Sequence, residues 1–150
     1  MKNQINKMII KIPSKSSNEG FARAAVAAFA AQMDPTIDEL NDIKTAVSEG
    51  VTNCIVHAYA DTVGIISITA AIYEGGIFEI KIRDTGRGIS DIEKAREPMF
   101  TTGGSERSGM GFTIMESFMD GFRISSAEGK GTTLTMRKKM TPRVGGSFSR

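Results

Sequence analysis

The sequence predicts a two-layer α/β sandwich, in which helices cover one face of a mixed, mainly antiparallel sheet. Apolar residues in the first third of the chain repeat every three or four positions, which is typical of helices packed on a core. Later segments alternate apolar and polar residues and occur in pairs joined by glycine turns, which predicts antiparallel hairpins. With 150 residues, 40% hydrophobic and 24% charged, the chain has the size and composition of one globular domain.

Two helices are expected near the N-terminus, after a short strand at residues 7–12 that Pro13 ends. The first helix runs from about Glu19 to Met33, where Asp34-Pro35 breaks it. The second runs from Thr36 to about Tyr59. Its core stripe, with apolar residues three or four positions apart, consists of Leu40, Ile43, Val47, Val51 and Cys54.

The rest of the chain is expected to form two hairpins, separated by a loop and a helix. Strands at residues 65–73 and 77–84 flank the turn Glu74-Gly75-Gly76, and the second strand alternates cleanly between apolar and polar positions. The expected elements that follow are a helical turn at 91–96, a loop at 98–108, a helix at 112–120, and strands at 122–128 and 132–138. The predicted order is therefore β-α-α-β-β-loop-α-β-β.

The C-terminal residues differ in composition from the rest of the chain. Residues 137–150 contain five basic and no acidic residues, together with glycine and serine, which predicts a flexible tail. We therefore divide the chain into a folded domain at 1–138 and a basic tail at 139–150. Without these five basic residues the net charge falls from +2 to about −3. The tail has no interleaved aromatic residues apart from Phe148, so no direct nucleic-acid partner is expected.

No feature of the sequence indicates a membrane or an oxidising compartment. No apolar run approaches the ~20 residues that a membrane-spanning helix needs, and the polar, charged start does not resemble a signal peptide. Cys54 is the single cysteine, so an internal disulfide is excluded. We expect a cytoplasmic protein without a membrane partner.

Three glycine-rich segments near the predicted strand ends indicate a ligand site. They are Asp84-Thr85-Gly86-Arg87-Gly88, Gly109-Met110-Gly111 and Gly129-Lys130-Gly131-Thr132. Glycine lets the backbone approach a ligand closely and present its N–H groups, as phosphate binding requires. Each segment alone is more often a simple turn, but three in one short chain favour a ligand. Neither the Walker spacing nor the dinucleotide-binding fingerprint fits these glycines.

Asp84 continues the apolar face of the strand at residues 77–84, so its carboxylate is expected to point toward the buried side. A buried carboxylate needs hydrogen-bond donors. Just before a glycine turn, it is placed to accept a hydrogen bond from the amino group of a purine. Alternatively, it only caps the loop by accepting from the N–H of Gly86 or Arg87. The local sequence favours both interpretations equally.

Glu49 and Asn53 lie four residues apart and therefore share one face of the second helix. The neighbouring small residues Ala46 and Gly50 are expected to leave room for a ligand there. An amide oxygen near phosphates is a suitable Mg²⁺ ligand, and a nearby carboxylate can deprotonate an attacking hydroxyl. For such a pair alone, an ordinary solvated helix face is the more common explanation.

These segments, in this order, resemble the signature of the GHKL ATPase/kinase superfamily. The signature consists of Glu-x-x-x-Asn on a helix, Asp-x-Gly-x-Gly, a lid that ends in Gly-x-Gly, and Gly-Thr at a strand start. Its positions in this chain are Glu49 and Asn53, Asp84 to Gly88, residues 98–111, and Gly131-Thr132. The resemblance implies the Bergerat ATP-binding fold of this superfamily, with ATP and Mg²⁺ as ligands.

A narrower resemblance is to the anti-sigma F factors of spore-forming Firmicutes, which are small serine kinases of that superfamily. Residues 48–59, 97–120 and 129–133 carry it. It implies that the chain, with ATP bound, binds and inhibits a sporulation sigma factor, sigma F. It also implies that the chain phosphorylates a serine of an anti-anti-sigma factor and works as a homodimer. The alternatives are a general-stress anti-sigma serine kinase and a nucleotide-gated sigma-binding module without kinase activity.

The resemblance also implies roles for individual residues around the base and the metal. Glu49 is expected to be the general base, and Asn53 is expected to bind Mg²⁺. Asp84 is expected to bind the amino group of adenine, with Thr132 helping directly or through water. Gly86 and Gly88 are expected to line the base pocket.

Further implied roles concern the lid and the partner surface. The lid residues expected to close over the phosphates are Thr101, Thr102, Gly109, Met110 and Gly111. Arg107, on the same lid, is expected to sense the γ-phosphate or to contact a partner. Arg23, on the first helix, is expected to contact the sigma factor and the anti-anti-sigma factor; alternatively, it is a solvated charge on an alanine-rich helix.

Overall fold

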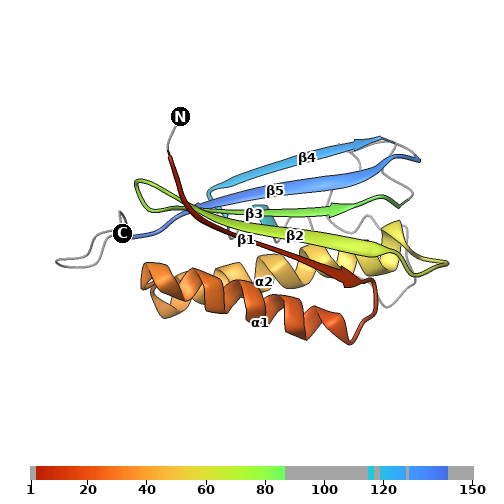
Figure 1. The fold of residues 1–150 in the computed structure, drawn as a ribbon, viewed down its shortest axis with the longest axis horizontal. Helices are drawn as coiled ribbons and strands as arrows, with labels where there is room; N and C mark the ends of the chain where they lie inside the picture. Colours follow the sequence, from red (N-terminus) through yellow and green to blue (C-terminus); the bar gives the residue numbers. More distant parts are fainter. Residues whose placement is uncertain (1–2, 87–114, 117–118, 128, 142–150) are drawn as a thin grey trace.

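A sheet forms one layer of the molecule and two helices form the other (Figure 1). The computed structural model describes residues 3–86, 115–116, 119–127 and 129–141. Helices α1 and α2 lie side by side against the same face of the sheet, and within these residues no helix covers the other face. The predicted two-layer α/β sandwich is confirmed.

The sheet of the described residues has five strands in the spatial order β1-β2-β3-β5-β4. All four ladders between neighbouring strands are antiparallel. β3 and β4 run in the same direction, but β5 lies between them, so the parallel pair that a mixed sheet requires is not found in this part of the chain. The strands are β1 (Gln4–Pro13), β2 (Ile65–Tyr73), β3 (Ile77–Asp84), β4 (Gly121–Ala127) and β5 (Gly131–Lys139).

The hairpin of β2 and β3 has the bounds that the residue alternation predicts. Its turn contains Gly75 and Gly76 with φ of 85° and 78°, a region that other residues rarely adopt. β1 is longer than the predicted strand at 7–12, because its polar first residues also pair with β2, as far as Gln4 opposite Tyr73. The second hairpin is confirmed with bounds that differ by one residue at each strand end.

Both predicted helices are present, but each ends in a turn of a different kind. Helix α1 (Asn18–Ala30) continues as one 3₁₀ turn (Ala31–Met33). Helix α2 (Ile37–Asn53) begins with a capping box between Thr36 and Glu39 and ends in a π turn (Cys54–Ala58), in which the N–H of Tyr59 donates to the carbonyl of Cys54 at 3.0 Å. The α-helical part of α2 is therefore shorter than the predicted segment that ends near Tyr59.

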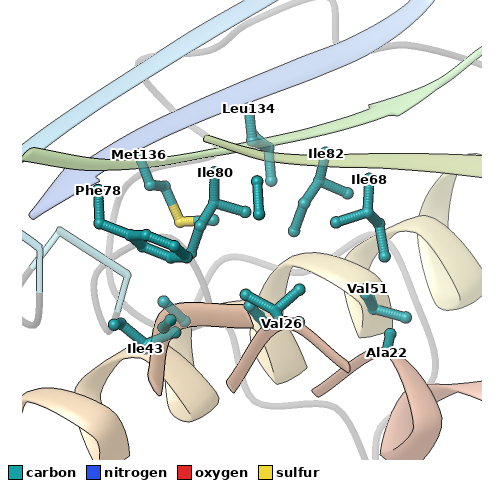
Figure 2. Packing of buried hydrophobic residues seen from close by; sticks show 14 of the residues in the cluster. Ala22, Val26, Ile43, Val51, Ile68, Phe78, Ile80, Ile82, Leu134 and Met136 are labelled. Carbon is teal, nitrogen blue, oxygen red and sulfur yellow. The ribbon is translucent and has the colours of Figure 1, made fainter. Parts of the chain in front are cut away.

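The hydrophobic core lies between the two layers (Figure 2). Alternate residues of the central strands point down onto the helices, and Ile43 and Val51 of the predicted stripe of α2 point up toward them. Val51 of α2 and Val26 of α1 face Ile68 of β2 and Ile82 of β3. At about 25 cal/mol per Å² of apolar surface removed from water, this layer contact is the main stabilising contribution in the fold. Neither described helix is both long enough and apolar enough to cross a membrane.

Several predicted elements lie wholly or partly outside the described residues. The helical turn at 91–96 and the loop at 98–108 are not among them. Of the helix predicted at 112–120, residues 115–116 are helical, and the side chains of Met115 and Met119 are buried in the core. The division into a folded domain and a basic tail stays a prediction, because residues 142–150 lie outside the described part of the chain.

Glu39 connects the start of α2 to the last described residues of the chain. One carboxylate oxygen accepts from the N–H of Thr36 at 2.9 Å, and the other accepts from the N–H of Thr141 at 2.7 Å. Burial alone would raise the pKa of Glu39, but these hydrogen bonds outweigh it and hold the pKa below its usual value. Glu39 therefore stabilises the fold in its ionised form.

We expect Glu39→Gln to lower the free energy of unfolding by about 2 kcal/mol at neutral pH, because one of the two backbone donors then faces an N–H₂ group. The stabilisation is present above the usual glutamate pKa and is lost as the pH falls through the lowered pKa of the folded protein. Urea denaturation of both proteins across this acidic range measures the difference. Asp38→Asn, an exposed acid in the same helical turn, is the control. An equal loss in the control would assign the effect to the helix dipole instead.

Candidate functional site

Asp84, the last residue of β3, is only 5% exposed and accepts hydrogen bonds from three donors among the described residues. Its Oδ1 accepts from the backbone N–H of Gly86 at 3.0 Å and of Thr132 at 3.2 Å. The thiol of Cys54 lies 3.5 Å from Oδ2 and donates to it. The loop-capping contact considered from the sequence is therefore present, but the carboxylate is also bound across the sheet to β5 and from the helical layer to the π turn that follows α2.

The environment of Asp84 disfavours its negative charge. Burial raises the pKa of its carboxyl, and the hydrogen bonds from Gly86, Cys54 and Thr132 offset only part of this effect. Burial and the neighbouring carboxylate also raise the pKa of the Cys54 thiol well above its usual value, so the thiol keeps its proton and remains a donor. Oδ1 has two strong backbone donors, whereas the donor to Oδ2 that the structure describes is a weak S–H group. A ligand N–H at Oδ2 would supply a stronger one.

Two glycines permit the close backbone contacts around Asp84. A Cβ at Gly86 would collide with the carbonyl of Ala58, at the end of the π turn. Gly131 has a φ of 89°, and a Cβ there would collide with the backbone of Asp84 and Thr85. The close contact with Ala58 therefore requires a glycine at position 86 for structural reasons. Its expected place in a base pocket stays a prediction.

The C-terminal end of α2, the end of β3 and the start of β5 lie at the same end of the molecule (at the right of Figure 1). Glu49 and Asn53 are half-buried on the last turns of α2. Asn53 directly precedes Cys54, whose thiol binds Asp84. The structure therefore brings the predicted helix pair and the predicted strand-end carboxylate into one neighbourhood, connected by Cys54.

The expectation that Ala46 and Gly50 leave room for a ligand is wrong. Ala46 is fully buried in the core. A Cβ at Gly50 would lie 2.5 Å from Cδ1 of Ile82 and 3.6 Å from both Leu134 and Met115. These small residues let α2 approach the sheet closely, so the space beside them is filled by core side chains.

Arg23 lies on the exposed side of α1 and contacts α2. Its Nη1 is 3.4 Å from the carboxylate of Glu19 and 3.4 Å from the hydroxyl of Ser48. Ser48 directly precedes Glu49 in the sequence. Arg23 is therefore a half-exposed cation beside the helix that carries the predicted base, and both interactions leave much of its side chain in solvent.

Three residues of this neighbourhood were not identified from the sequence as part of the site. Cys54 was assigned only to the core stripe. The hydroxyl of Tyr59 accepts from the N–H of Thr85 and donates to the carbonyl of Ile65, both at 2.8 Å, and so fixes the start of the glycine turn. Ser126, opposite Thr132 in the second hairpin, binds the hydroxyl of Thr132 at 2.7 Å. Its pairing with Thr132 depends on the register of the second hairpin, which the predicted strand bounds did not specify.

The remaining predicted site residues lie outside the described part of the chain. They are Gly88, Thr101, Thr102, Arg107, Gly109, Met110 and Gly111. Among the described residues, no group of three or more histidine, cysteine, aspartate or glutamate side chains is arranged to hold a metal ion. Magnesium ions at nucleotide sites commonly have one or two protein ligands, and phosphates and water supply the others.

Comparison with known proteins shows the family to which this chain belongs. The sequence pattern of the family described as "Histidine kinase-like ATPase domain" matches residues 12–138. The anti-sigma F factor of Caldanaerobacter subterraneus is 58% identical over 134 residues, which are 89% of this chain and 93% of that protein. This chain belongs to the anti-sigma F factor family. The family member of Clostridium acetobutylicum is 52% identical over 89% of this chain and 94% of its own length.

Solved structures similar to this anti-sigma F family member share its fold. The RsbU and RsbW domains of a Mycobacterium tuberculosis protein match with a TM-score of 0.69 at 21% identity, over 93% of this chain and 34% of that one. The mycobacterial sensor histidine kinase MprB matches with a TM-score of 0.58 at 15% identity, over 91% of this chain and 100% of that one. The predicted resemblance is thus confirmed, and the ATPase domain of this family implies a nucleotide site.

Proposed function

We propose that this anti-sigma factor, with ATP bound, holds sigma F inactive and phosphorylates a serine of its anti-anti-sigma factor. The observation that carries the proposal is the contact between the buried carboxylate of Asp84 and the thiol of Cys54. Cys54 directly follows Asn53, the last residue of the helix that contains Glu49, the predicted base. The curated relatives that are 52–58% identical over about nine-tenths of the chain, all named anti-sigma F factor, support the choice of partner.

The buried carboxylate fits the adenine end of ATP. Asp84 is held in place by two backbone N–H groups at Oδ1, so Oδ2 is positioned to accept from the 6-amino group. The raised pKa of this carboxyl means that it gains from a further donor. Thr132, directly opposite Asp84 in the register of β3 and β5, adds a second polar atom beside it.

Asn53 is the residue that we propose to hold Mg²⁺ through its amide oxygen. It is half-buried at the last α-helical position of α2, and oxygen is the ligand type that Mg²⁺ prefers. When bound, the ion supplies positive charge that offsets the charge on the phosphates during transfer.

Glu49 is the residue that we propose as the general base. It lies one helical turn before Asn53, so its carboxylate and the amide are on the same face of α2. In the reaction, the serine oxygen of the partner forms a bond to the γ-phosphorus, and the bond between that phosphorus and the β,γ-bridging oxygen breaks. The serine proton passes to Glu49, and ADP leaves.

The same proposal assigns the partner contacts. Arg23, half-exposed beside Ser48 on α2, is proposed to contact both protein partners. Its contact with Ser48, the residue before Glu49, supports the proposal that the serine substrate binds near the proposed base. The chain is proposed to act as a homodimer.

The test is phosphoryl transfer from γ-labelled ATP to a purified anti-anti-sigma factor, with capture of sigma F measured in parallel. We expect an acid-stable, alkali-labile label on the substrate and nucleotide-dependent capture of sigma F. Capture without any label would contradict the kinase and support a nucleotide-gated binding module. Label on a general-stress anti-anti-sigma factor, with none on the sporulation protein, would assign the chain to the stress branch.

We expect Asn53→Ala to abolish Mg²⁺-dependent ATP binding, because the substitution removes the proposed oxygen ligand and leaves the helix intact. Titration calorimetry with ATP, with and without Mg²⁺, measures it. Asn41→Ala, at an exposed position of the same helix, is the matched control and should bind normally. Normal affinity of Asn53→Ala would show that the metal is held elsewhere.

A further inference from the structure

A pair of hydroxyl groups lies beside Asp84, where β4 and β5 meet. Ser126 of β4 is paired with Thr132 of β5 in the antiparallel register, and Thr132 is in turn paired with Asp84 of β3. The hydroxyl of Ser126 donates to the carbonyl of Gly131 at 2.9 Å. The oxygens of the Ser126 and Thr132 hydroxyls are 2.7 Å apart.

Counting the protons fixes the direction of the bond between the two hydroxyls. A hydroxyl has one proton and two lone pairs. Ser126 gives its proton to the carbonyl of Gly131, which can only accept. At the 2.7 Å contact Thr132 must therefore be the donor. The Oγ1 atom of Thr132 then presents lone pairs alone to anything else that approaches it.

The backbone of Thr132 adds no free donor on this side, since its N–H is donated to Oδ1 of Asp84 at 3.2 Å. An ionised Asp84 also only accepts. Both polar side chains at this paired position, Asp84 and Thr132, are thus hydrogen-bond acceptors toward a ligand. Both are less than a tenth exposed, so an opposing acceptor would be left without a partner away from bulk water.

We propose that Ser126 is a specificity-determining residue, which makes the site select 6-amino purines by holding the proton of Thr132. The inference rests on the proposed function, in which this site binds the base of ATP. The 6-amino group of adenine carries two N–H donors and matches two acceptors. The 6-oxo group of hypoxanthine or guanine is an acceptor and is repelled. Ser126 does not touch the base; it acts through Thr132.

The test compares the affinities for ATP and inosine triphosphate, which differ at the 6-position. In Ser126→Ala the hydroxyl of Thr132 is released, can turn and can donate to a 6-oxo group. We expect the preference for ATP over inosine triphosphate to fall about tenfold, which is the scale of one hydrogen bond in a buried site. Ser126→Thr keeps the hydroxyl and should retain the wild-type preference. Ser125→Ala, on the exposed opposite face of the same strand, is the control.

The readout separates this role from a structural one. If Ser126 only stabilises the hairpin, Ser126→Ala weakens both nucleotides in parallel and their ratio is unchanged, which would overturn the inference. Thr132→Val removes the acceptor itself and should lower the ratio on its own. In that background Ser126→Ala should have no further effect on the ratio, and additive effects would also contradict the relay.

The same titrations distinguish failure of this inference from failure of the proposed function. A wild-type protein that binds ATP, together with an unchanged ratio in Ser126→Ala, overturns the role of Ser126 alone. A folded wild-type protein that binds neither nucleotide overturns the proposed function and the role of Ser126 with it. Thermal denaturation of each variant without nucleotide establishes that it is folded.

Discussion

Asp84→Asn should abolish ATP binding while leaving the fold at least as stable as that of the wild type. The amide oxygen of asparagine can still accept from the N–H groups of Gly86 and Thr132. The N–H₂ group then takes the place of Oδ2 and meets the amino group of adenine as donor against donor. We expect ATP affinity to fall by at least about 100-fold, the scale of losing a charge-assisted hydrogen bond in a buried site.

The expected gain in stability follows from the electrostatics of the same residue. Burial raises the pKa of Asp84, so ionisation of this carboxyl is less favourable in the folded protein than in the unfolded chain. Asparagine has nearly the same shape and no charge, and therefore avoids this unfavourable contribution at neutral pH. Sites that bind ligands often keep such unfavourable groups, because the ligand compensates for them.

Titration calorimetry with Mg²⁺ and ATP, and thermal denaturation without nucleotide, measure the two effects separately. Asp38→Asn, an exposed position of α2, is the matched control and should change neither. A large drop in melting temperature for Asp84→Asn would show that the carboxylate is mainly structural. Retained ATP affinity would remove Asp84 from base recognition.

The burial of Asp84 could be predicted from the sequence, but its partners could not. Alternation along β3 places residue 84 on the same face as Phe78 and Ile82, and this local rule holds in the structure. The thiol of Cys54 comes from a helix 30 positions earlier, and its approach depends on how α2 packs on the sheet. Periodicity indicates that Cys54 is buried, but not which polar group it meets.

The end of α2 shows the same limit. Local sequence predicts a helix up to Tyr59, and the chain does turn helically that far. The helix changes to a π turn at Cys54, and Tyr59, which closes this turn, is held by the bonds of its hydroxyl to Thr85 and Ile65. Likewise, the small residues Ala46 and Gly50 indicate that another group approaches α2 closely at this position. In the structure that group is the side chain of Ile82 and not a ligand.

The fold class was predictable because it depends on local patterns that agree with one another. Glycine turns of positive φ, alternating strands and an apolar helical stripe each specify one element, and two hairpins then require antiparallel neighbours. The site joins three elements that are distant in the sequence. Only the ordered signature of a known superfamily connected Glu49, Asp84 and Thr132 before the structure placed Asp84 and Thr132 side by side.

Glu49→Gln should slow phosphoryl transfer by ~100-fold or more and leave ATP binding nearly unchanged. Glutamine matches the size of glutamate and keeps a polar group on this half-buried face of α2, but it cannot take the serine proton. The proposed base-recognition contacts centre on Asp84 at the end of β3, so the substitution leaves them in place. Single-turnover transfer from labelled ATP to the anti-anti-sigma factor measures the rate, and calorimetry measures the affinity.

Glu74→Gln, an exposed glutamate in the turn between β2 and β3, is the control and should transfer phosphate at the wild-type rate. An unchanged single-turnover rate in Glu49→Gln would remove Glu49 from the chemistry. A variant that loses transfer but still binds ATP should also still capture sigma F, because in the proposed function holding the sigma factor requires the bound nucleotide and not its reaction. Such a protein would still hold sigma F but could no longer phosphorylate its anti-anti-sigma factor, so the two proposed activities would be separated by one proton-accepting oxygen.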